Sequence, residues 1–244
     1  MPDLLWFVGP VSVAAGAVAA VSGFGIGSLL TPLLVVWMPT PHAVAILAIP
    51  HALATAIRFV RLRSDVHLPT FKQFGLASAA GGLAGAALQS WLGSSVLTVL
   101  LASLLVLAGS TELARRRVPL PETGFWRLLG GVLSGLFGGL VGNQGGIRAA
   151  ALLGFRLTPR QIVATATASA LLVDAARLPI YFLSAGPVIA RSTSIWITAS
   201  IGVTIGTFIG VPLLGRIPEP TYRRLVGLLL LLLGISLFTS SFRR

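Results

Sequence analysis

The stretch Gly-Phe-Gly-Ile-Gly-Ser-Leu-Leu-Thr-Pro-Leu-Leu at residues 23–34 decides the fold, because the second half of the chain contains a counterpart. The counterpart, Gly-Asn-Gln-Gly-Gly-Ile-Arg-Ala-Ala-Ala-Leu-Leu, occupies residues 142–153. A Thr-Pro pair follows each stretch, at residues 40–41 and 158–159, so that Gly27 corresponds to Gly145. This self-similarity predicts a chain built from two structurally related halves.

The composition is that of a protein embedded in a lipid bilayer. Of the 244 residues, 55% are hydrophobic and 10% are charged, whereas about a quarter of the residues in soluble domains are charged. Apolar runs at residues 96–109 and 225–238 contain no ionisable residue and have the length of membrane-buried helices. Residues 1–21 lack the basic start and the cleavage site of a signal peptide, so we expect them to belong to the membrane domain.

The net charge of +12 comes from 18 basic and 6 acidic residues. In a soluble protein this excess would suggest nucleic acid as a partner. Here the arginines are divided among short loops at the edges of apolar segments, where they can anchor the chain to lipid headgroups. We therefore expect the lipid bilayer, and no nucleic acid, as a partner.

Each half contains four apolar segments, and the first segment of each half is too long for one span of about 20 residues. Both long segments carry a glycine cluster near the middle, which predicts a broken helix. The segments of the first half are 4–37, 41–63, 71–92 and 95–112. Those of the second half are 127–155, 159–183, 189–215 and 221–240. The halves, residues 1–112 and 127–244, are joined by a linker at residues 113–126.

The positions of the basic residues predict the topology, because cytoplasmic loops collect Arg and Lys. If each long segment crossed the membrane once, Arg61, Arg63 and Lys72 would lie opposite the basic run at residues 115–117. If both long segments are hairpins, nearly all basic loops fall on one side, and only Arg191 and the terminal Arg243-Arg244 do not. The expected fold is an all-α polytopic membrane protein with two inverted repeats, each a broken, hairpin-like helix pair plus three transmembrane helices. Its linker lies in the cytoplasm and both termini lie on the periplasmic side.

The two glycine breaks are the candidate substrate site. A helix interrupted at mid-membrane exposes free amide groups, and the positive end of the half-helix that follows attracts an anion. Side-chain amides and a guanidinium next to the second break add hydrogen-bond donors suited to an oxyanion. The alternative is that these polar residues only cap the broken helices. The candidate binding residues are Gly25, Gly27, Ser28, Thr31, Asn143, Gln144, Gly145, Gly146 and Arg148.

Four further ionisable residues inside the spans are candidates for coupling or gating: His51, Arg58, Asp174 and Arg177. A central Arg or Asp costs about 2.5–3.5 kcal/mol on the translocon scale, so such residues usually face a cavity or a partner. Asp174 and Arg177 are neighbours on a helix and could instead neutralise each other. Arg58 could reach the headgroups, and His51 could be a hydrogen-bonded packing residue. Glycines at 81, 82 and 85 and at 202, 206 and 210 are expected to allow close helix packing.

No enzyme signature is present in the sequence. Six acidic residues, three histidines and no cysteine form no paired carboxylates, no metal-spaced cluster and no Ser/His/Asp set that can be placed together. Neither glycine cluster has the Lys-Ser/Thr ending of a phosphate-binding loop. We therefore expect no catalytic activity, no cofactor, no metal and no nucleotide hydrolysis.

The two glycine breaks, each followed by a small or apolar half-helix and a Thr-Pro entry to the next span, resemble the TauE/SafE family of sulfite-exporter-like membrane transporters. The resemblance covers essentially the whole chain. It implies a carrier in the bacterial inner membrane for sulfite, sulfoacetate or another organosulfonate, without a nucleotide-binding subunit. Family members often have longer glycine runs, which are interrupted here by Phe24, Ile26, Asn143 and Gln144. The alternatives are an anion channel and a carrier for another small carboxylate, and a homodimer is one option for the assembly.

Overall fold

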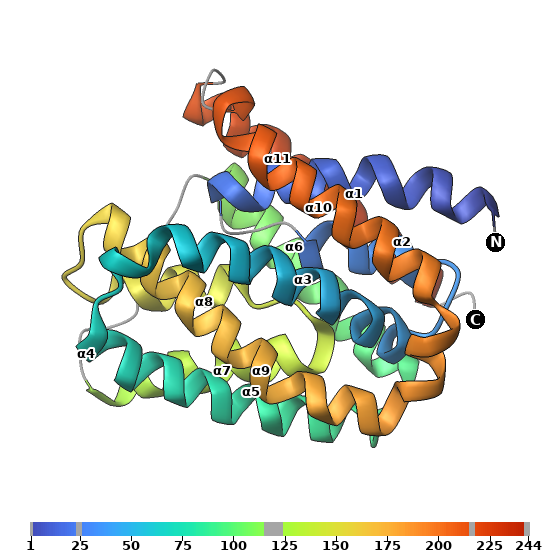
Figure 1. Cartoon of the computed structure of the whole chain (residues 1–244), viewed down its shortest axis with the longest axis horizontal. Coiled ribbons are helices and arrows are strands. Elements are labelled where there is room, and N and C mark those ends of the chain that lie inside the picture. The colour runs from blue at the N-terminus through green and yellow to red at the C-terminus, as the bar shows by residue number, and fades with distance from the viewer. Residues whose placement is uncertain (1, 23–25, 115–123, 215–217, 242–244) are drawn as a thin grey trace.

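The structure is a computed structural model that describes residues 2–22, 26–114, 124–214 and 218–241. All secondary structure in these ranges is helical, and they contain no strand (Figure 1). Six helices are long and apolar enough to cross a membrane, and the apolar helices Leu4–Ala20 and Ile26–Val35 are shorter. The predicted all-α polytopic membrane protein is therefore confirmed.

The break predicted in the first half falls on residues 23–25, which lie outside the described residues. The helical segments on either side of it are α1 (Pro2–Ser22), and the π-helical turn η1 (Ile26–Leu30) with the short helix α2 (Thr31–Val35). Three further helical segments follow. They are formed by α3 (Thr40–Leu62), then by the 3-10 turn η2 (Arg63–Asp65), α4 (Leu68–Thr70), the π-helical turn η3 (Phe71–Gly75) and α5 (Leu76–Gln89), and finally by α6 (Ser94–Leu113).

The second half repeats this order with a second broken pair, α7 (Gly124–Val141) and α8 (Gly145–Leu153). It continues with α9 (Pro159–Arg191), α10 (Thr193–Leu214) and α11 (Glu219–Ser241). The Thr-Pro pair starts α9 through a capping box, in which Thr158 and Gln161 exchange hydrogen bonds between side chain and backbone. Pro159 occupies the first turn, where a missing N–H costs nothing.

The predicted boundary between segments 159–183 and 189–215 falls at a kink in α9. Ala185 has non-helical backbone angles (φ −131°, ψ 15°) just before the Gly-Pro pair at residues 186–187, so two helical stretches meet there. The second stretch reaches Arg191, and α10 begins at Thr193. The predicted linker is shorter than expected at its ends, because residue 113 belongs to α6 and residues 124–126 belong to α7.

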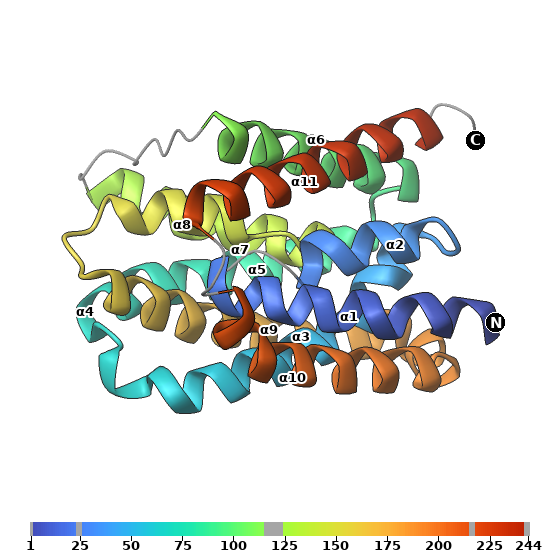
Figure 2. The ribbon, with the colours of Figure 1, turned by 90° about the horizontal axis from the view of Figure 1, so that it is seen from above.

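The helices of the two halves pair across the molecule. Helix α1 packs against α10 and α7 against α5, while α3 packs against α9 and α6 against α11. Exchanging the halves converts the α1–α10 pair into the α7–α5 pair and leaves the α3–α9 and α6–α11 pairs unchanged. The start of α1 and the end of α11 lie at the same end of the bundle (Figures 1 and 2). These pairs support the predicted repeat, whose inverted relation remains a prediction.

Glycines bring the paired helices into backbone contact, as expected for helices in lipid. A Cβ on Gly135 of α7 would lie 1.8 Å from the carbonyl oxygen of Ser78 in α5. A Cβ on Gly206 of α10 would lie 2.0 Å from the carbonyl oxygen of Val13 in α1. The prediction that the glycines of these segments serve packing is therefore confirmed at these interfaces.

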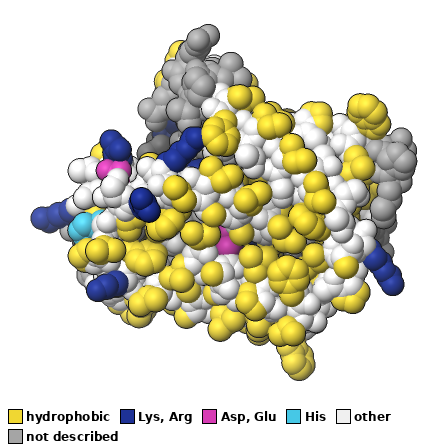
Figure 3. Space-filling model, in the orientation of Figure 1, with side chains coloured by type: hydrophobic (Ala, Val, Ile, Leu, Met, Phe, Trp, Pro, Cys, Tyr) yellow, Lys and Arg dark blue, Asp and Glu magenta, His cyan; other side chains and the backbone are white. Residues whose placement is uncertain are grey.

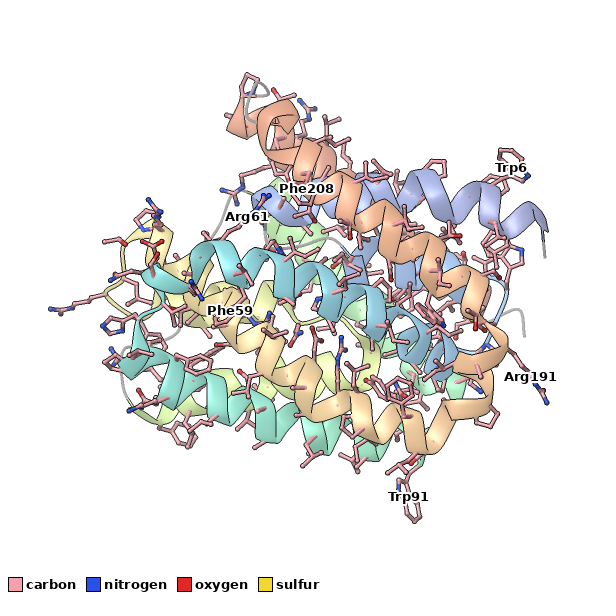
Figure 4. All side chains as sticks on the ribbon, in the orientation of Figure 1. Trp6, Phe59, Arg61, Trp91, Arg191 and Phe208 are labelled. Atoms are coloured by element: carbon pink, nitrogen blue, oxygen red, sulfur yellow. The ribbon has the colours of Figure 1, made fainter. Side chains whose placement is uncertain are left out.

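Basic side chains gather at one end of the molecule, where α3 ends and α9 begins, and the face between the ends is largely hydrophobic (Figure 3). An ion pair between Arg160 and Asp65 (2.9 Å) joins the two loops at this end. Arg191 lies at the opposite end, towards which the exposed Trp6 and Trp91 also lie (Figure 4). Outward-facing tryptophans are typical of the membrane–water interface, so the bundle axis runs across the bilayer.

Candidate functional site

The two broken helix pairs meet at their breaks. A Cβ on Gly27 would lie 2.0 Å from the carbonyl oxygen of Gly142, so only glycine allows this approach of one break to the other. Gly142 has a φ of +71°, a left-handed conformation that ends α7 and that side chains other than glycine rarely adopt. The sequence repeat therefore brings its two glycine clusters into contact in the folded protein.

A hydrogen bond joins the two halves beside this contact. The Ser28 hydroxyl donates to Oδ1 of Asn143 (3.2 Å), and both side chains are buried. Gln144 packs against the last turn of α7, because a Cβ on Gly138 would lie 2.5 Å from its Oε1. Gly145 and Gly146 form the first turn of α8, and the predicted Gly25 lies outside the described residues.

Several buried polar atoms at this junction have no hydrogen-bond partner among the described residues. They are Nε and Nη2 of Arg148, Nδ2 of Asn143, Nε2 and Oε1 of Gln144 and Oγ1 of Thr31. An unpaired buried donor costs about 1–3 kcal/mol, and more when the group is charged. Most of these atoms are donors and Arg148 is only 6% exposed, so an acceptor that carries negative charge would satisfy them.

A second cluster binds the end of α7 to α9. Arg177 donates through Nη1 to the carbonyl oxygen of Gly138, and Tyr181 donates to that of Gly139. Gln89 of α5 donates to the carbonyl oxygen of Leu140 (2.8 Å). These carbonyls belong to the last turn of α7. The carbonyl oxygen of Gly138 also accepts from the N–H of Gly142 (3.1 Å), whereas Tyr181 and Gln89 bind the carbonyls of Gly139 and Leu140, which the break leaves without a helical partner.

Asp174 lies between Arg177 and His51. Its Oδ1 accepts a hydrogen bond from Nε of Arg177 (3.0 Å) and forms an ion pair with Nη2 of the same guanidinium (2.8 Å). Its Oδ2 lies 2.7 Å from Nδ1 of His51, a residue of α3 in the other half. The carboxylate is completely buried, so the ion pair that the sequence offered as an alternative is present, with a histidine bound to it.

Arg58 holds the corresponding end of the first broken helix. Its Nη1 donates to the carbonyl oxygen of Ala19 in the last turn of α1 (2.7 Å), and its Nη2 donates to Thr55 (3.4 Å). Arg177 makes the same two kinds of contact, to Gly138 and to Asp174, in the second half. Each half therefore uses an arginine of its second span, and a polar residue three positions earlier, to bind the end of its broken helix.

Four charged side chains near the junction are close enough to interact electrostatically. Arg148 interacts electrostatically with Asp174 and Arg177 of α9 and with Arg58 of α3. Three guanidinium groups and one carboxylate leave this region positively charged. Within the described residues no three His, Cys, Asp or Glu side chains gather in a way that could hold a metal ion.

A family model described as Sulfite exporter TauE/SafE matches residues 8–237. The chain belongs to the TauE/SafE sulfite exporter family. This membership and the six apolar helices make it a multi-pass membrane protein of a transporter family. No curated protein and no solved structure matches the chain. In this TauE/SafE protein, the matched region includes both glycine breaks and all four ionisable residues inside the spans.

Sequence reasoning missed Gln89 and Tyr181, which hold the end of α7 together with Arg177. Gln89 carried a signal, because it is an amide at the end of an otherwise apolar segment. Tyr181 carried little signal, since a tyrosine in a span is ordinarily a packing residue. In the structure both side chains are buried, and their polar atoms bind carbonyl oxygens at the end of α7.

Proposed function

We propose that this protein is a secondary transporter that moves small sulfur-containing anions, such as sulfite, sulfoacetate or another organosulfonate, across the bacterial inner membrane. The substrate binds at the junction of the two broken helix pairs. Membership of the sulfite exporter family supports the class of substrate. The chemistry of the junction supports its charge.

The unpaired guanidinium of Arg148 is the observation that carries this proposal. Two of its nitrogens are buried without a described partner, next to the free amide nitrogens of Asn143 and Gln144. A sulfonate or carboxylate supplies acceptors in the planar arrangement that a guanidinium fork matches. A cation would be repelled, and a neutral ligand would leave the buried charge uncompensated.

The helix ends at the junction add to the same field. Arg148 lies in the first turns of α8, and the free N–H groups of that helix start at the break. The positive end of a helix favours an anion by typically 0.3–1 kcal/mol at exposed sites, and by up to about 2 kcal/mol when partly buried. The backbone and the side chains therefore favour the same ligand.

The arrangement supports a carrier more than a channel. Six buried polar atoms without a partner among the described residues belong to side chains at the junction where the two breaks touch, which favours one binding site at that depth. With inverted repeats, movement of the helices around a fixed site exposes that site to each side of the membrane in turn.

Flux into liposomes tests the proposal. Purified protein is reconstituted, and uptake of labelled sulfite, sulfoacetate and taurine is compared; sulfite and sulfoacetate should enter, and zwitterionic taurine should enter more slowly. Arg148→Ala should weaken binding by about ten- to a hundredfold, because losing a charge-assisted hydrogen bond costs about 1.5–3 kcal/mol. Arg148→Lys should restore binding only in part, since an ammonium lacks the two-pronged donor geometry.

Arg191→Ala is the matched control, because it removes the same side chain at an exposed position at the far end of the bundle. It should bind and transport as the wild type does. If folded Arg148→Ala binds both sulfur anions with wild-type affinity, the junction is not the substrate site.

A further inference from the structure

His51 occupies a position where a proton can be bound within the membrane domain. Its Nδ1 lies 2.7 Å from Oδ2 of Asp174, and its side chain is 13% exposed while that of Asp174 is fully buried. The carboxylate is paired with Arg177 and is therefore ionised, and an ionised carboxylate only accepts hydrogen bonds. Nδ1 of His51 then carries the donated hydrogen, and Nε2 keeps a lone pair. No described residue forms a hydrogen bond with Nε2.

The charged groups that face His51 are few. Asp174 and Arg177 face it from α9, and Arg58 lies on its own helix, α3. Within their described ranges, η1, α2 and α10, which also pack against α3, contain no ionisable residue. The remaining elements packed against α3 carry charged residues at its ends, namely Glu112 of α6 bound to Arg223, Arg127 of α7 bound to Gly154, and Arg63 and Asp65 of η2.

Contacts lead from His51 to the proposed anion site. His51 binds Asp174, Asp174 binds Arg177, and Arg177 donates to the carbonyl oxygen of Gly138. Gly138 in turn is in contact with Gln144, one of the residues with unpaired atoms at the junction. The histidine is thus linked through a short run of direct contacts to the place where the anion is proposed to bind.

Among the described residues, the first half has no corresponding set of a histidine, a carboxylate and an arginine in contact. There, Thr55 occupies the place of Asp174 beside Arg58, and a hydroxyl offers no charge for a histidine to bind. The guanidinium of Arg58 binds the end of α1 without an acidic partner among the described residues. The two halves therefore share the arginine that holds the broken helix, and among the described residues the second half alone connects it to a histidine, a side chain that can gain or lose a proton.

We propose that His51 is the proton-binding site of a proton-coupled anion transporter. A proton from water binds Nε2 when the anion occupies the junction, is carried with the anion in the same direction, and returns to water when the anion leaves. The negative charge of the anion offsets the charge that the proton adds beside Arg177. Binding of each ion therefore favours binding of the other. This inference rests on the proposed anion transport.

Calorimetry on the wild type tests the linkage directly. Sulfoacetate is the probe, because its acid groups stay ionised between about pH 6 and 8 and any proton exchanged comes from the protein or the buffer. Titrations near pH 7 in buffers of different ionisation enthalpy should show proton uptake on binding. Affinity should rise by about tenfold from about pH 8 to about pH 6. Binding without proton uptake anywhere in this range would overturn the proposal.

His51→Gln removes the titratable group but keeps a polar side chain that can donate to Asp174. It should still bind and exchange sulfoacetate, with no proton uptake and with an affinity that no longer changes with pH. His42→Gln is the matched control, because it makes the same substitution on the same helix, and it should keep the proton uptake of the wild type. A His51→Gln protein that still moves protons with sulfoacetate would refute the assignment.

Counterflow in liposomes separates this inference from the proposed function. If the wild type exchanges no sulfur anion at all, the proposed function fails and the coupling fails with it. If the wild type exchanges sulfoacetate while a pH indicator inside the liposomes records no anion-dependent proton movement, only the coupling is wrong.

Discussion

Removing the charge of Asp174 should destabilise the fold strongly, because it would leave Arg177 without its counterion in the membrane interior. Arg177 is 1% exposed and Asp174 is 0% exposed. Breaking a buried ion pair from one side costs about 3–5 kcal/mol. Asp174→Asn keeps the volume of the side chain, so the loss measures charge and hydrogen bonding rather than a cavity.

A double-mutant cycle isolates the energy of the pair. Asp174→Asn, Arg177→Leu and the double variant are unfolded reversibly in mixed micelles, and the free energies of unfolding are compared. Residues in contact within one network show coupling of about 0.5–3 kcal/mol, and a buried ion pair should lie in the upper part of this range. The double variant should therefore be more stable than the sum of the single losses indicates.

The ion pair between Arg160 and Asp65 provides the matched control, since it allows the same two substitutions at an exposed site. Its side chains are 73% and 24% exposed. An exposed pair contributes about 0–1 kcal/mol. Equal coupling in the two cycles would refute the reasoning, because burial is the difference on which the argument depends.

Three further predictions follow from the packing, the topology and the charge of the site. Gly135→Ala should destabilise the protein, because the new Cβ would lie 1.8 Å from a backbone oxygen. Gly186→Ala should be tolerated, because nothing lies within 4 Å of the new Cβ. The thermal unfolding temperatures of the two variants test this difference. The chain has no cysteine of its own, so single cysteines can be placed at Ser64 and Ser95. A thiol reagent that does not cross the membrane should label these two positions from opposite sides of the membrane. Labelling of both from the same side would contradict the hairpin topology. Exchange of labelled anion should be faster than net efflux by about tenfold or more, because an empty site leaves Arg148 uncompensated in the membrane; equal rates would contradict this.

The sequence contained enough information to predict the break between α7 and α8, because a glycine cluster in an overlong apolar segment acts locally. A helix that must end inside a membrane needs a residue such as Gly142, whose φ is +71°. The Thr-Pro pair also acts locally, as the start of α9 shows. The boundary between segments 159–183 and 189–215 also has a local cause, because α9 is kinked at Ala185, next to the Gly-Pro pair at residues 186–187, although its second stretch continues to Arg191.

The contacts between the halves lay beyond reach of the sequence. Ser28 and Asn143 are far apart along the chain, and nothing local specifies that one donates to the other. The same is true of His51 and Asp174, which belong to different repeats and meet only because α3 packs against α9. Residue type predicted which side chains were costly in lipid, and only the fold determined which partner each one has.

The arginines inside the membrane domain differ in how their charge is balanced, and this difference separates support from binding. Arg177 has a carboxylate and a helix end, and Arg58 has a helix end and a hydroxyl. Arg148 is buried with two nitrogens unpaired among the described residues. Carbonyl groups at a helix end attract cations, so the first two arginines lower the cost of the breaks. Arg148 is a buried charge that no described residue neutralises. An anion that enters the site would therefore stabilise it. The loaded junction is therefore closer to electrical neutrality than the empty one.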